Sequence, residues 1–472
     1  MLKLKLFIYR LSVILSVFGL ILISLSGKGL TNSASGKHVG PASDGENIKI
    51  QSANMAARVE IVAHRFEQEI DGNQAPVGWC FVVLKTRWEN IHPKKKIEKD
   101  KLEGKTDRTM GVKTFAQKKE TKKEEYVEVD VAYMIEKILN HAYLLADGLA
   151  FSLHRMTEDI PGGAILEEAF TISKFGETRP ANFVYLIPEK VENIGFRLFD
   201  YEYGHIDIPI QGDIKKALGT EGLVGGVISR AKNDAVEVAV HSFDFRDDYD
   251  EEEAPEDWRY AVIRLSGKSL LGKNVKDIVQ IEPEEYTWVT TEGGYFYYCE
   301  GGSTTDEGMI RFTPEVFQHQ ELAFLIPASD QLSQLGLRLR NDVLMLDLTE
   351  RKPNGLPKPR ASHRDGDIME VMFFMAREEN GKIILDIGIQ SLAKSGIEIQ
   401  GEAQFMLVVN DEKISLDDSA TDELLHRPPT PFIIPPKIFV RFELAFETDA
   451  SPTSLYYRGY RSERYFDFIK II

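Results

Sequence analysis

The sequence predicts an all-β protein made of three tandem β-sandwich domains. Two observations lead to this prediction. Short segments in which apolar and polar residues alternate, rich in β-branched side chains, recur along the chain between groups of Gly, Asn, Asp and Pro. The same ordered set of segments occurs twice, and more faintly a third time, which indicates an internal duplication. A chain of 472 residues agrees with several domains, because a single hydrophobic core rarely grows that large.

The first domain is predicted over residues 55–211. It opens with an alternating strand, ARVEIVAHRFE, and a tryptophan-led strand, WCFVVLKT, follows from Trp79. The segment LLADGLAFSL is typical of a hairpin in which a Gly turn joins two strands. The domain ends with a Leu-Ile-Pro segment at Leu186–Pro188 and a Leu-rich strand. Because proline cannot donate to a β ladder, we expect Pro188 at the end of a strand or on a sheet edge.

The second domain, residues 233–350, repeats these landmarks in the same order: DAVEVAVHSFDF, WRYAVIRL, VTTEGGYFYY and a second Leu-Ile-Pro at Leu325–Pro327. The third domain, residues 367–472, has GDIMEVMFFMARE, KIILDIGIQS and QFMLVVNDEKISL in the matching places, but it lacks the proline. We expect the two Leu-Ile-Pro segments to occupy equivalent positions. We also expect no sheet to run from one domain into the next.

Alternating strands give each sheet one apolar face, and two such faces close on each other as a sandwich. Seven or eight strands in ~100–120 residues are typical of an immunoglobulin-like sandwich. The predicted fold is therefore three tandem immunoglobulin-like β-sandwich domains after an N-terminal signal or anchor segment. Between and before the domains we expect a flexible tether at 36–54, a charged insertion at 92–128, a linker with a short helix at 212–232 and a Pro/Lys-rich linker at 351–366.

The N-terminus predicts export. Three basic residues in the first ten precede an apolar run at Leu11–Ser26, as in a signal peptide. We interpret residues 1–35 as a cleaved signal peptide, with a single uncleaved N-terminal membrane anchor as the alternative, because the run is short for a span of ~20 residues. Both interpretations place the domains outside the cytoplasm, in the periplasm, on the cell surface or secreted.

The composition excludes some classes of function. A net charge of −17 argues against a nucleic-acid partner, because phosphate binding needs a basic surface. The two cysteines, Cys80 and Cys299, are far apart in apolar or aromatic segments, so they predict buried free thiols rather than a disulfide framework or a zinc site.

The chain resembles bacterial exported immunoglobulin-like domains of unknown function. Four features carry the resemblance: the Asp147-Gly148 and Glu292-Gly293 turns, and the strand pairs Phe183–Pro188 with Phe196–Leu198 and Phe324–Pro327 with Leu337–Leu339. It would cover most of residues 55–472, although the chain lacks the lipid-anchor cysteine common in such proteins. The resemblance implies extracytoplasmic binding or spacing and no known catalytic set.

Several residues invite a chemical interpretation. His64 and His241 recur at matching places in the two alignable domains, and His205 and Asp207 lie two apart, so that one strand face would present both as the start of a metal site. The segment HRDGD, at His363–Asp367, superficially matches the motif of a kinase catalytic loop. In each case a structural role is the simpler interpretation, because no partner motif accompanies these residues.

The segment Asp244–Asp257 holds nine acidic residues and one arginine. A solvated loop is its simpler interpretation. The alternative is a calcium site, because oxygen-rich loops at the ends of extracellular sandwiches can surround a hard cation. Its ligands would be Asp247, Asp248, Asp250 and Glu251.

These observations predict a non-enzymatic, exported, multi-domain binding or scaffolding protein of the cell envelope. Its partner would be a protein or a cell-envelope polymer, and we predict no catalytic residue and no cofactor other than the calcium alternative. Two other functions stay open: an envelope-acting hydrolase whose site is assembled from loops, and a structural spacer. A deep pocket with two carboxylates, or with a His–carboxylate pair at hydrogen-bond distance, would favour the enzyme.

Overall fold

The computed structural model describes residues 50–98, 126–219, 226–250, 252–302, 309–339, 342–349, 357–429, 432–448 and 450–467. All of them belong to one compact unit, Asp44–Ile472. The predicted signal or anchor at 1–35, residues 36–49 of the tether, most of the charged insertion and Glu251 lie outside the described residues, whereas Ile50–Ala53 of the predicted tether form a strand instead. Within the described residues, no helix has the length and hydropathy that a membrane span requires.

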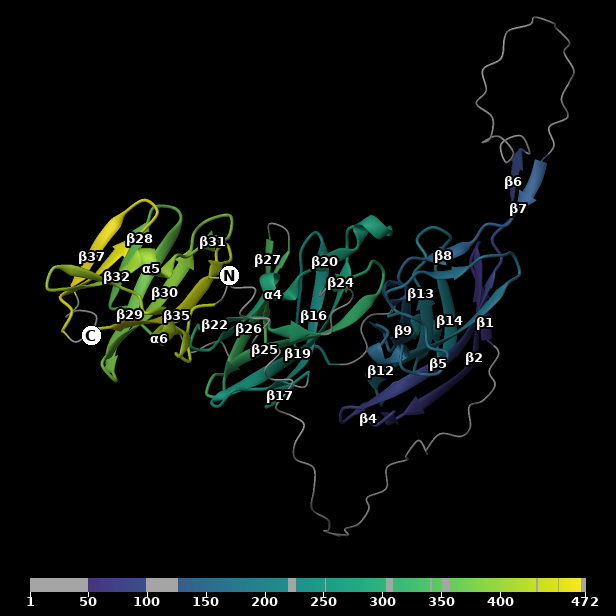
Figure 1. The fold of residues 1–472 in the computed structure, drawn as a ribbon, viewed down its shortest axis with the longest axis horizontal. Coiled ribbons are helices and arrows are strands. Elements are labelled where there is room, and N and C mark those ends of the chain that lie inside the picture. Colours follow the sequence, from purple (N-terminus) through teal and green to yellow (C-terminus); the bar gives the residue numbers. More distant parts are fainter. Residues whose placement is uncertain are drawn as a thin grey trace, which may run out of the picture. The chain divides into compact units, whose positions relative to one another are not determined.

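Each of three successive repeats contributes two sets of four paired strands, and one set of the first repeat continues into one set of the second as a single sheet. Figure 1 labels many of these elements. The first repeat pairs β1 (Ile50–Ala53), β2 (Ala57–Glu67), β5 (Trp79–Asn90) and β12 (Thr178–Pro188) in one sheet, and β14 (Ile206–Gln211), β13 (Ile194–Leu198), β9 (Ala142–Ala146) and β10 (Leu149–Phe151) in the other. The second repeat pairs β15 (Ser229–Lys232), β16 (Val236–Arg246), β19 (Trp258–Ser269) and β25 (Phe317–Pro327), and then β27 (Asp342–Asp347), β26 (Leu332–Leu339), β21 (Thr287–Thr291) and β22 (Phe296–Tyr298). The third repeat pairs β28 (Ala361–Asp365), β29 (Met369–Glu379), β30 (Lys382–Ser391) and β35 (Phe439–Glu447), and then β37 (Glu463–Asp467), β36 (Ser454–Arg458), β32 (Phe405–Val409) and β33 (Glu412–Ser415).

The prediction of an all-β chain of sandwich-like sheets is confirmed. In each repeat the first, second, third and sixth of these strands pair in one sheet, and the eighth, seventh, fourth and fifth pair in the other. This order differs from the ABED and CFG sheets of an immunoglobulin constant domain, although sandwiches with the same architecture vary in topology. The residue boundaries of the three domains stay a prediction.

Short elements decorate the sheets. Two-residue to four-residue strands pair as β3 (Glu69–Ile70) with β4 (Asn73–Gln74), β6 (Lys95–Glu98) with β7 (Tyr126–Val129), β8 (Tyr133–Ile135) with β11 (Phe170–Ile172), β17 (Asp248–Tyr249) with β18 (Glu252–Glu253), β20 (Val279–Ile281) with β24 (Ile310–Phe312), β31 (Ile397–Glu398) with β34 (Ile433–Ile434), and β23 (Gly301–Gly302) with β25. The short helices are η1 (Ile138–Asn140), η2 (Arg155–Thr157), α3 (Ile214–Ala217), η3 (Val275–Asp277), α4 (Pro283–Tyr286), α5 (Gly401–Gln404) and α6 (Asp418–Asp422). The α3 helix lies in the predicted linker at 212–232, where a short helix was expected.

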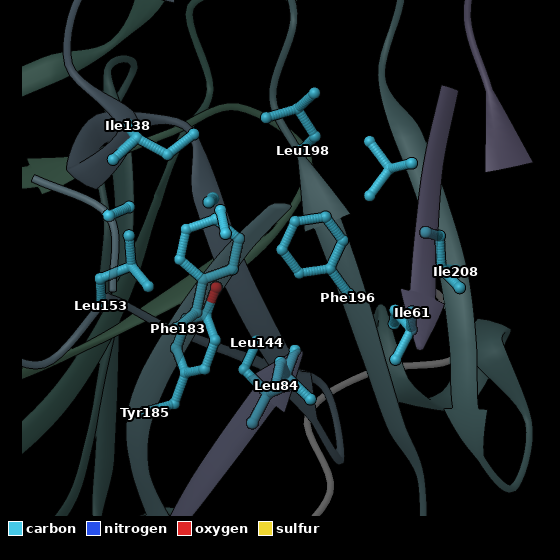
Figure 2. Close-up of a cluster of buried hydrophobic side chains, with 14 of the residues drawn as sticks. Ile61, Leu84, Ile138, Leu144, Leu153, Phe183, Tyr185, Phe196, Leu198 and Ile208 are labelled. Atoms are coloured by element: carbon cyan, nitrogen blue, oxygen red, sulfur yellow. The ribbon is translucent and has the colours of Figure 1, made fainter. Parts of the chain in front are cut away.

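Buried apolar side chains form one main cluster for each repeat, and the cluster of the third repeat also includes Trp288 and Phe296 of the second. In the first repeat, Phe183 and Phe196 stack at 6.2 Å and the Trp88 ring meets both edge-on. Figure 2 shows Phe183 and Phe196 among the aliphatic side chains that the facing strands contribute. Fully buried aromatic side chains of this size dominate the energetics of a core.

A β-bulge recurs in all three repeats at one place. The ladder between the second and third strands skips Val62 in β2, His241 in β16 and Phe374 in β29. His241 therefore corresponds to Val62, and His64 lies two residues farther along β2. The prediction that the two histidines are equivalent is wrong. A shift of two residues keeps every side chain on its face, so the alternating pattern alone could not detect it.

The Leu-Ile-Pro segments do occupy equivalent positions. Pro188 ends β12 opposite Trp79, and Pro327 ends β25 opposite Trp258. Both prolines stand at a strand end, as predicted from their missing N–H. The hairpin predicted around Asp147-Gly148 is also present between β9 and β10, with φ of +44° and +92° at the two turn residues.

The expectation that no sheet crosses from one domain to the next is wrong. β10 of the first repeat pairs in parallel with β25 of the second, through Leu149 with Phe317 and Ala150 with Gln318. The physical reason is that β10 would otherwise leave an unpaired row of backbone groups at the edge of its sheet. The sheet consequently runs without a break from β14 to β15.

Candidate functional site

Charged side chains gather where neighbouring repeats meet. We call these places the first junction (Arg197, His205, Asp207, Lys273 and Glu315) and the second junction (Tyr295, Asp330, Asp386, His426, Arg441 and Glu443). Each set combines residues of two repeats, so neither is visible as a motif in the sequence.

At the second junction, His426 lies between two carboxylates. Its Nε2 is 3.2 Å from Asp330 Oδ1, and its Nδ1 is 3.8 Å from Glu443 Oε2. Asp330 belongs to the turn after β25 of the second repeat, His426 follows α6 in the third, and Glu443 lies on β35. The Tyr295 ring stacks on the imidazole at 3.6 Å between centroids. The imidazole is thereby held from three sides.

The charges around His426 fix its protonation. Burial opposes the charged imidazolium, but hydrogen bonds to Asp330 and Glu443 outweigh it and raise the pKa of His426 to about 9. Burial likewise opposes the Glu443 carboxylate, and hydrogen bonds from His426 and Arg377 overcome it and lower the pKa of Glu443 to about 2. At neutral pH the pair is a salt bridge. A protonated histidine can donate a proton but cannot serve as a general base, and the enzyme alternative stays untested.

The His426 bridge should give the stability of the protein a pH dependence. The pKa of His426 rises from 6.5 to about 9 on folding. Its contribution is therefore fully present below pH 6.5 and lost as the pH rises through 9, amounting to about 1–3 kcal/mol. Urea unfolding between pH 6 and pH 10 measures this loss. The same series on His426→Gln is the control, and an unchanged slope in that variant would contradict the assignment.

An ionic pair within the third repeat positions an arginine that contacts the second repeat. The guanidinium of Arg441 on β35 donates to Asp386 on β30 at 2.8 and 2.5 Å and to the carbonyl of Gly293 at 2.8 Å. Its backbone N–H donates to the Gly294 carbonyl at 3.1 Å. The turn of the second repeat is thus bound by both the main chain and the side chain of one arginine.

The first junction contains the predicted pair His205 and Asp207. His205 lies just before β14. Glu315 is a third candidate ligand, and its Oε2 is 3.8 Å from His205 Nε2. The centre of the group, however, holds a guanidinium. Arg197 is 3.4 Å from Asp207 and 2.9 Å from Glu315 with a side chain only 8% exposed. A built-in cation thus satisfies these carboxylates, and burial lowers the pKa of His205 while it raises that of Asp207.

The acidic segment forms the hairpin of β17 and β18. Asp248 lies opposite Glu253, and the turn between them contains Asp250 with a φ of +51°. Asp250 is 3.7 Å from Arg155, and both side chains are exposed. Across the described part of the chain, no three His, Cys, Asp or Glu side chains converge as metal ligands, and Glu251 lies outside it. Calcium binding by Asp247, Asp248, Asp250 and Glu251 stays a prediction.

A thermal scan of the full chain in millimolar calcium and in chelator tests this prediction. A bound ion would raise the melting temperature in proportion to its concentration, because it binds the folded state alone. The gain should vanish when Asp247, Asp248 and Asp250 are changed to Asn. Equal melting temperatures in calcium and chelator would leave the solvated loop as the sole interpretation.

The other singled-out residues have structural roles. Asp365 of the HRDGD segment is fully buried and accepts hydrogen bonds from the Tyr460 and Arg461 N–H groups and the Ser462 hydroxyl. It therefore fixes the turn between β36 and β37. The His241 Nε2 is 2.7 Å from the Ser266 hydroxyl. Cys80 and Cys299 are buried free thiols, as predicted, and burial raises the pKa of both.

A surface groove of about 440 Å³ lies in the second repeat, lined by Ile278, Val279, Gln280, Ile281, Glu282, Tyr286, Met309, Arg338 and Leu339. Its walls are mainly aliphatic, with one carboxylate and one guanidinium. Among the described residues, the lining contains no histidine and no second carboxylate.

No protein-family model matches the chain. No curated protein matches it. Among solved structures, the chain is similar to an uncharacterized β-sandwich protein from Clostridium difficile 630, with 11% identity, coverage of 25% of this chain and 89% of that chain, and a TM-score of 0.18.

Proposed function

We propose that the chain is a non-enzymatic, exported, multi-domain scaffolding or binding protein of the cell envelope, whose partner is a protein or an envelope polymer. The observation that carries this proposal is the way the repeats are joined. Both junctions place the strand after a Gly turn against the sixth strand of the next repeat: Leu149 pairs with Phe317, and Tyr295 forms a parallel bridge with Arg441.

Buried charge supports the proposal. Arg197 pairs with Glu315 across the first junction, and His426 pairs with Asp330 across the second, where Arg441 also donates to the Gly293 carbonyl. Removing one member of such a buried pair is strongly destabilising, so the pairs resist separation of the repeats. A scaffold or spacer needs its domains to be held at a fixed distance from one another. A catalyst, in contrast, needs charged groups that are free to contact a substrate.

A distance measurement between spin labels tests the scaffold. Labels on Lys276 and Lys394, both exposed, would report across the second junction. We expect a narrow distance distribution in the full chain and a broad one in Arg441→Met. Lys382→Met, which removes an exposed ion pair of the third repeat, is the matched control and should leave the distribution narrow. A broad distribution in the unmodified chain would contradict a scaffolding role.

Export needs a separate test. The predicted segment 1–35 should direct the chain out of the cytoplasm, so fractionated cells should contain the domains outside it. Recovery of the full-length chain in the cytoplasm, with Met1–Ser26 retained, would refute this part of the proposal.

A further inference from the structure

His319 of the second repeat and Arg441 of the third occupy equivalent positions on their sixth strands. His319 lies opposite Ser266 on β19, and Arg441 lies opposite Gly388 on β30. Ser266 and Gly388 in turn lie the same number of ladder pairs from the β-bulge that the repeats share. The two side chains can therefore be compared directly.

Both side chains contact the preceding repeat through aromatic rings. The His319 ring stacks on Phe151 at 5.0 Å between centroids and is 5.5 Å from Trp79, so three rings pack together at the first junction. At the second junction, the Arg441 guanidinium is 4.7 Å from the centre of the Tyr295 ring. His319 is partly buried, and its Nδ1 is shielded from solvent. This position therefore joins each repeat to the one before it.

The two positions differ in the charge that faces them. Arg441 is paired with Asp386, at 2.5 Å. The residue equivalent to Asp386 in the second repeat is Arg264, because each pairs with the residue that directly follows the bulge. The Arg264 guanidinium is 5.7 Å from the centre of the Trp79 ring, on which His319 also packs. A proton on His319 would thus meet a cation where Arg441 meets a carboxylate.

The carboxylates on this face of the second repeat are already paired. Arg264 is 2.9 Å from Asp244 and 3.1 Å from Glu321, and Lys268 is 3.5 Å from Glu237. His241 adds a second titratable ring, because its Nε2 is 2.7 Å from the hydroxyl of Ser266, the ladder partner of His319. The charged and titratable groups that face His319 from β16, β19 and β25 are Glu237, His241, Asp244, Arg264, Lys268 and Glu321. The first repeat contributes the rings of Trp79 and Phe151 to the contact.

We propose that protonation of His319 loosens the first junction at acidic pH, while the permanently charged Arg441 keeps the second junction closed. The neutral imidazole packs against two apolar rings, whereas an imidazolium in the same place would lose hydration beside another cation. Histidine protonation at an interface is a general way to make a contact depend on pH. The proposal goes beyond the scaffolding role, because it makes one of two joints respond to acid, and it requires only the fold.

The direction of the pH dependence follows from the shift in the pKa of His319. Burial, His241 and Arg264 lower this pKa from 6.5 to about 3 in the closed junction. In an open junction the ring is exposed and titrates near its ordinary pKa of ~6.5. The closed form is therefore fully favoured above pH 6.5. Below that value, its population relative to the open form falls by up to about tenfold for each pH unit.

Hydrogen exchange along the full chain between pH 7 and pH 4.5 tests the proposal, after correction for the intrinsic pH dependence of exchange. The amides of β10, which pair with β25 across the first junction, should lose at least about tenfold in protection on acidification. The amides of β30 in the third repeat should keep their protection. A loss in β30 as large as that in β10 would mean acid unfolding of the whole chain and would overturn the proposal.

His319→Phe assigns the effect to one residue, because phenylalanine keeps a flat ring and cannot be protonated. It should remove at least half of the pH dependence of β10 exchange. His319→Gln serves the same purpose if His319→Phe does not fold. His363→Gln is the matched control: this histidine of the third repeat is 2.8 Å from the Ser462 hydroxyl, and its loss should leave the pH dependence unchanged. His205→Gln, which removes the other histidine of the first junction, should leave at least half of it.

Three further results would overturn the proposal. The first is equal protection of β10 at pH 7 and pH 4.5. The second is higher protection at acidic pH, which would mean that Trp79 and Phe151 stabilise the imidazolium through cation–π contacts. The third is a pH dependence that falls by less than half in His319→Phe, or in His319→Gln where that variant replaces it, which would assign the acid response to His205 or His241.

Discussion

Arg441→Met is expected to lower the free energy of unfolding by about 3–5 kcal/mol, because it leaves a buried carboxylate without its counter-ion. That carboxylate belongs to Asp386, whose side chain is 3% exposed. The same substitution removes the hydrogen bond to the Gly293 carbonyl. It should therefore weaken the second junction as well as the third repeat. Urea unfolding followed by tryptophan fluorescence and circular dichroism measures the change.

Two controls separate the orphaned charge from lost packing. Adding Asp386→Asn to Arg441→Met should recover part of the loss, because it removes the unpaired charge. Lys382→Met breaks the exposed pair with Glu423 and should change the stability by less than about 1 kcal/mol. A loss below about 1 kcal/mol in Arg441→Met would show that Asp386 finds another partner. The stabilising role assigned here to Arg441 would then be wrong.

Much of the fold could be predicted from local pattern. The alternating segment ARVEIVAHRFE spans the same residues as β2, Ala57–Glu67, and both tryptophan-led strands begin at the tryptophan, at Trp79 and Trp258. The first half of β2 alternates between buried and partly exposed residues, whereas β5 and β19 contain continuous buried runs, which the sequence shows as unbroken apolar segments. The positions of Pro188 and Pro327 followed from chemistry, since neither residue has an N–H to donate.

The pairing between repeats could not be predicted in this way. Whether β10 meets β25 depends on how two sandwiches dock, and nothing in Leu149–Phe151 distinguishes an edge that stays free from one that is covered. The false match of His64 with His241 has a related cause. A strand pattern fixes the face of a side chain but not its register, and a bulge shifts the register without changing the pattern.

The charged clusters were missed for a different reason. His426 and Asp330 are 96 residues apart, and Arg441 and Asp386 are 55 apart. Each residue taken alone looks like a polar group on a strand or loop, so no spacing marks the pair. His205 and Asp207 were noticed, but the sequence does not show that Arg197 reaches them. A metal site and an ion pair with arginine use the same carboxylates, and only the fold separates the two.

Trp288→Ala is expected to lower the free energy of unfolding by about 3–5 kcal/mol, as for other buried aromatic residues. Trp288 lies on β21 of the second repeat and is fully buried. Its ring covers Gly336 of β26, where an added Cβ would lie 2.1 Å from it, and stacks on Phe296 at 5.5 Å. Trp288 and Phe296 nevertheless belong to the cluster that contains the core of the third repeat. The cavity should therefore weaken both repeats.

Hydrogen exchange resolved along the chain tests this coupling. In Trp288→Ala, the amides of β26 and of β30 should both exchange faster, because the strands of both repeats lose packing around the missing ring. Trp88→Ala is the matched control: it opens a cavity in the core of the first repeat, where Trp88 meets Phe183 and Phe196, and it should leave β30 unchanged. Faster exchange in β26 alone would mean that the second and third repeats unfold independently, and the second junction would then contribute specificity of docking rather than stability.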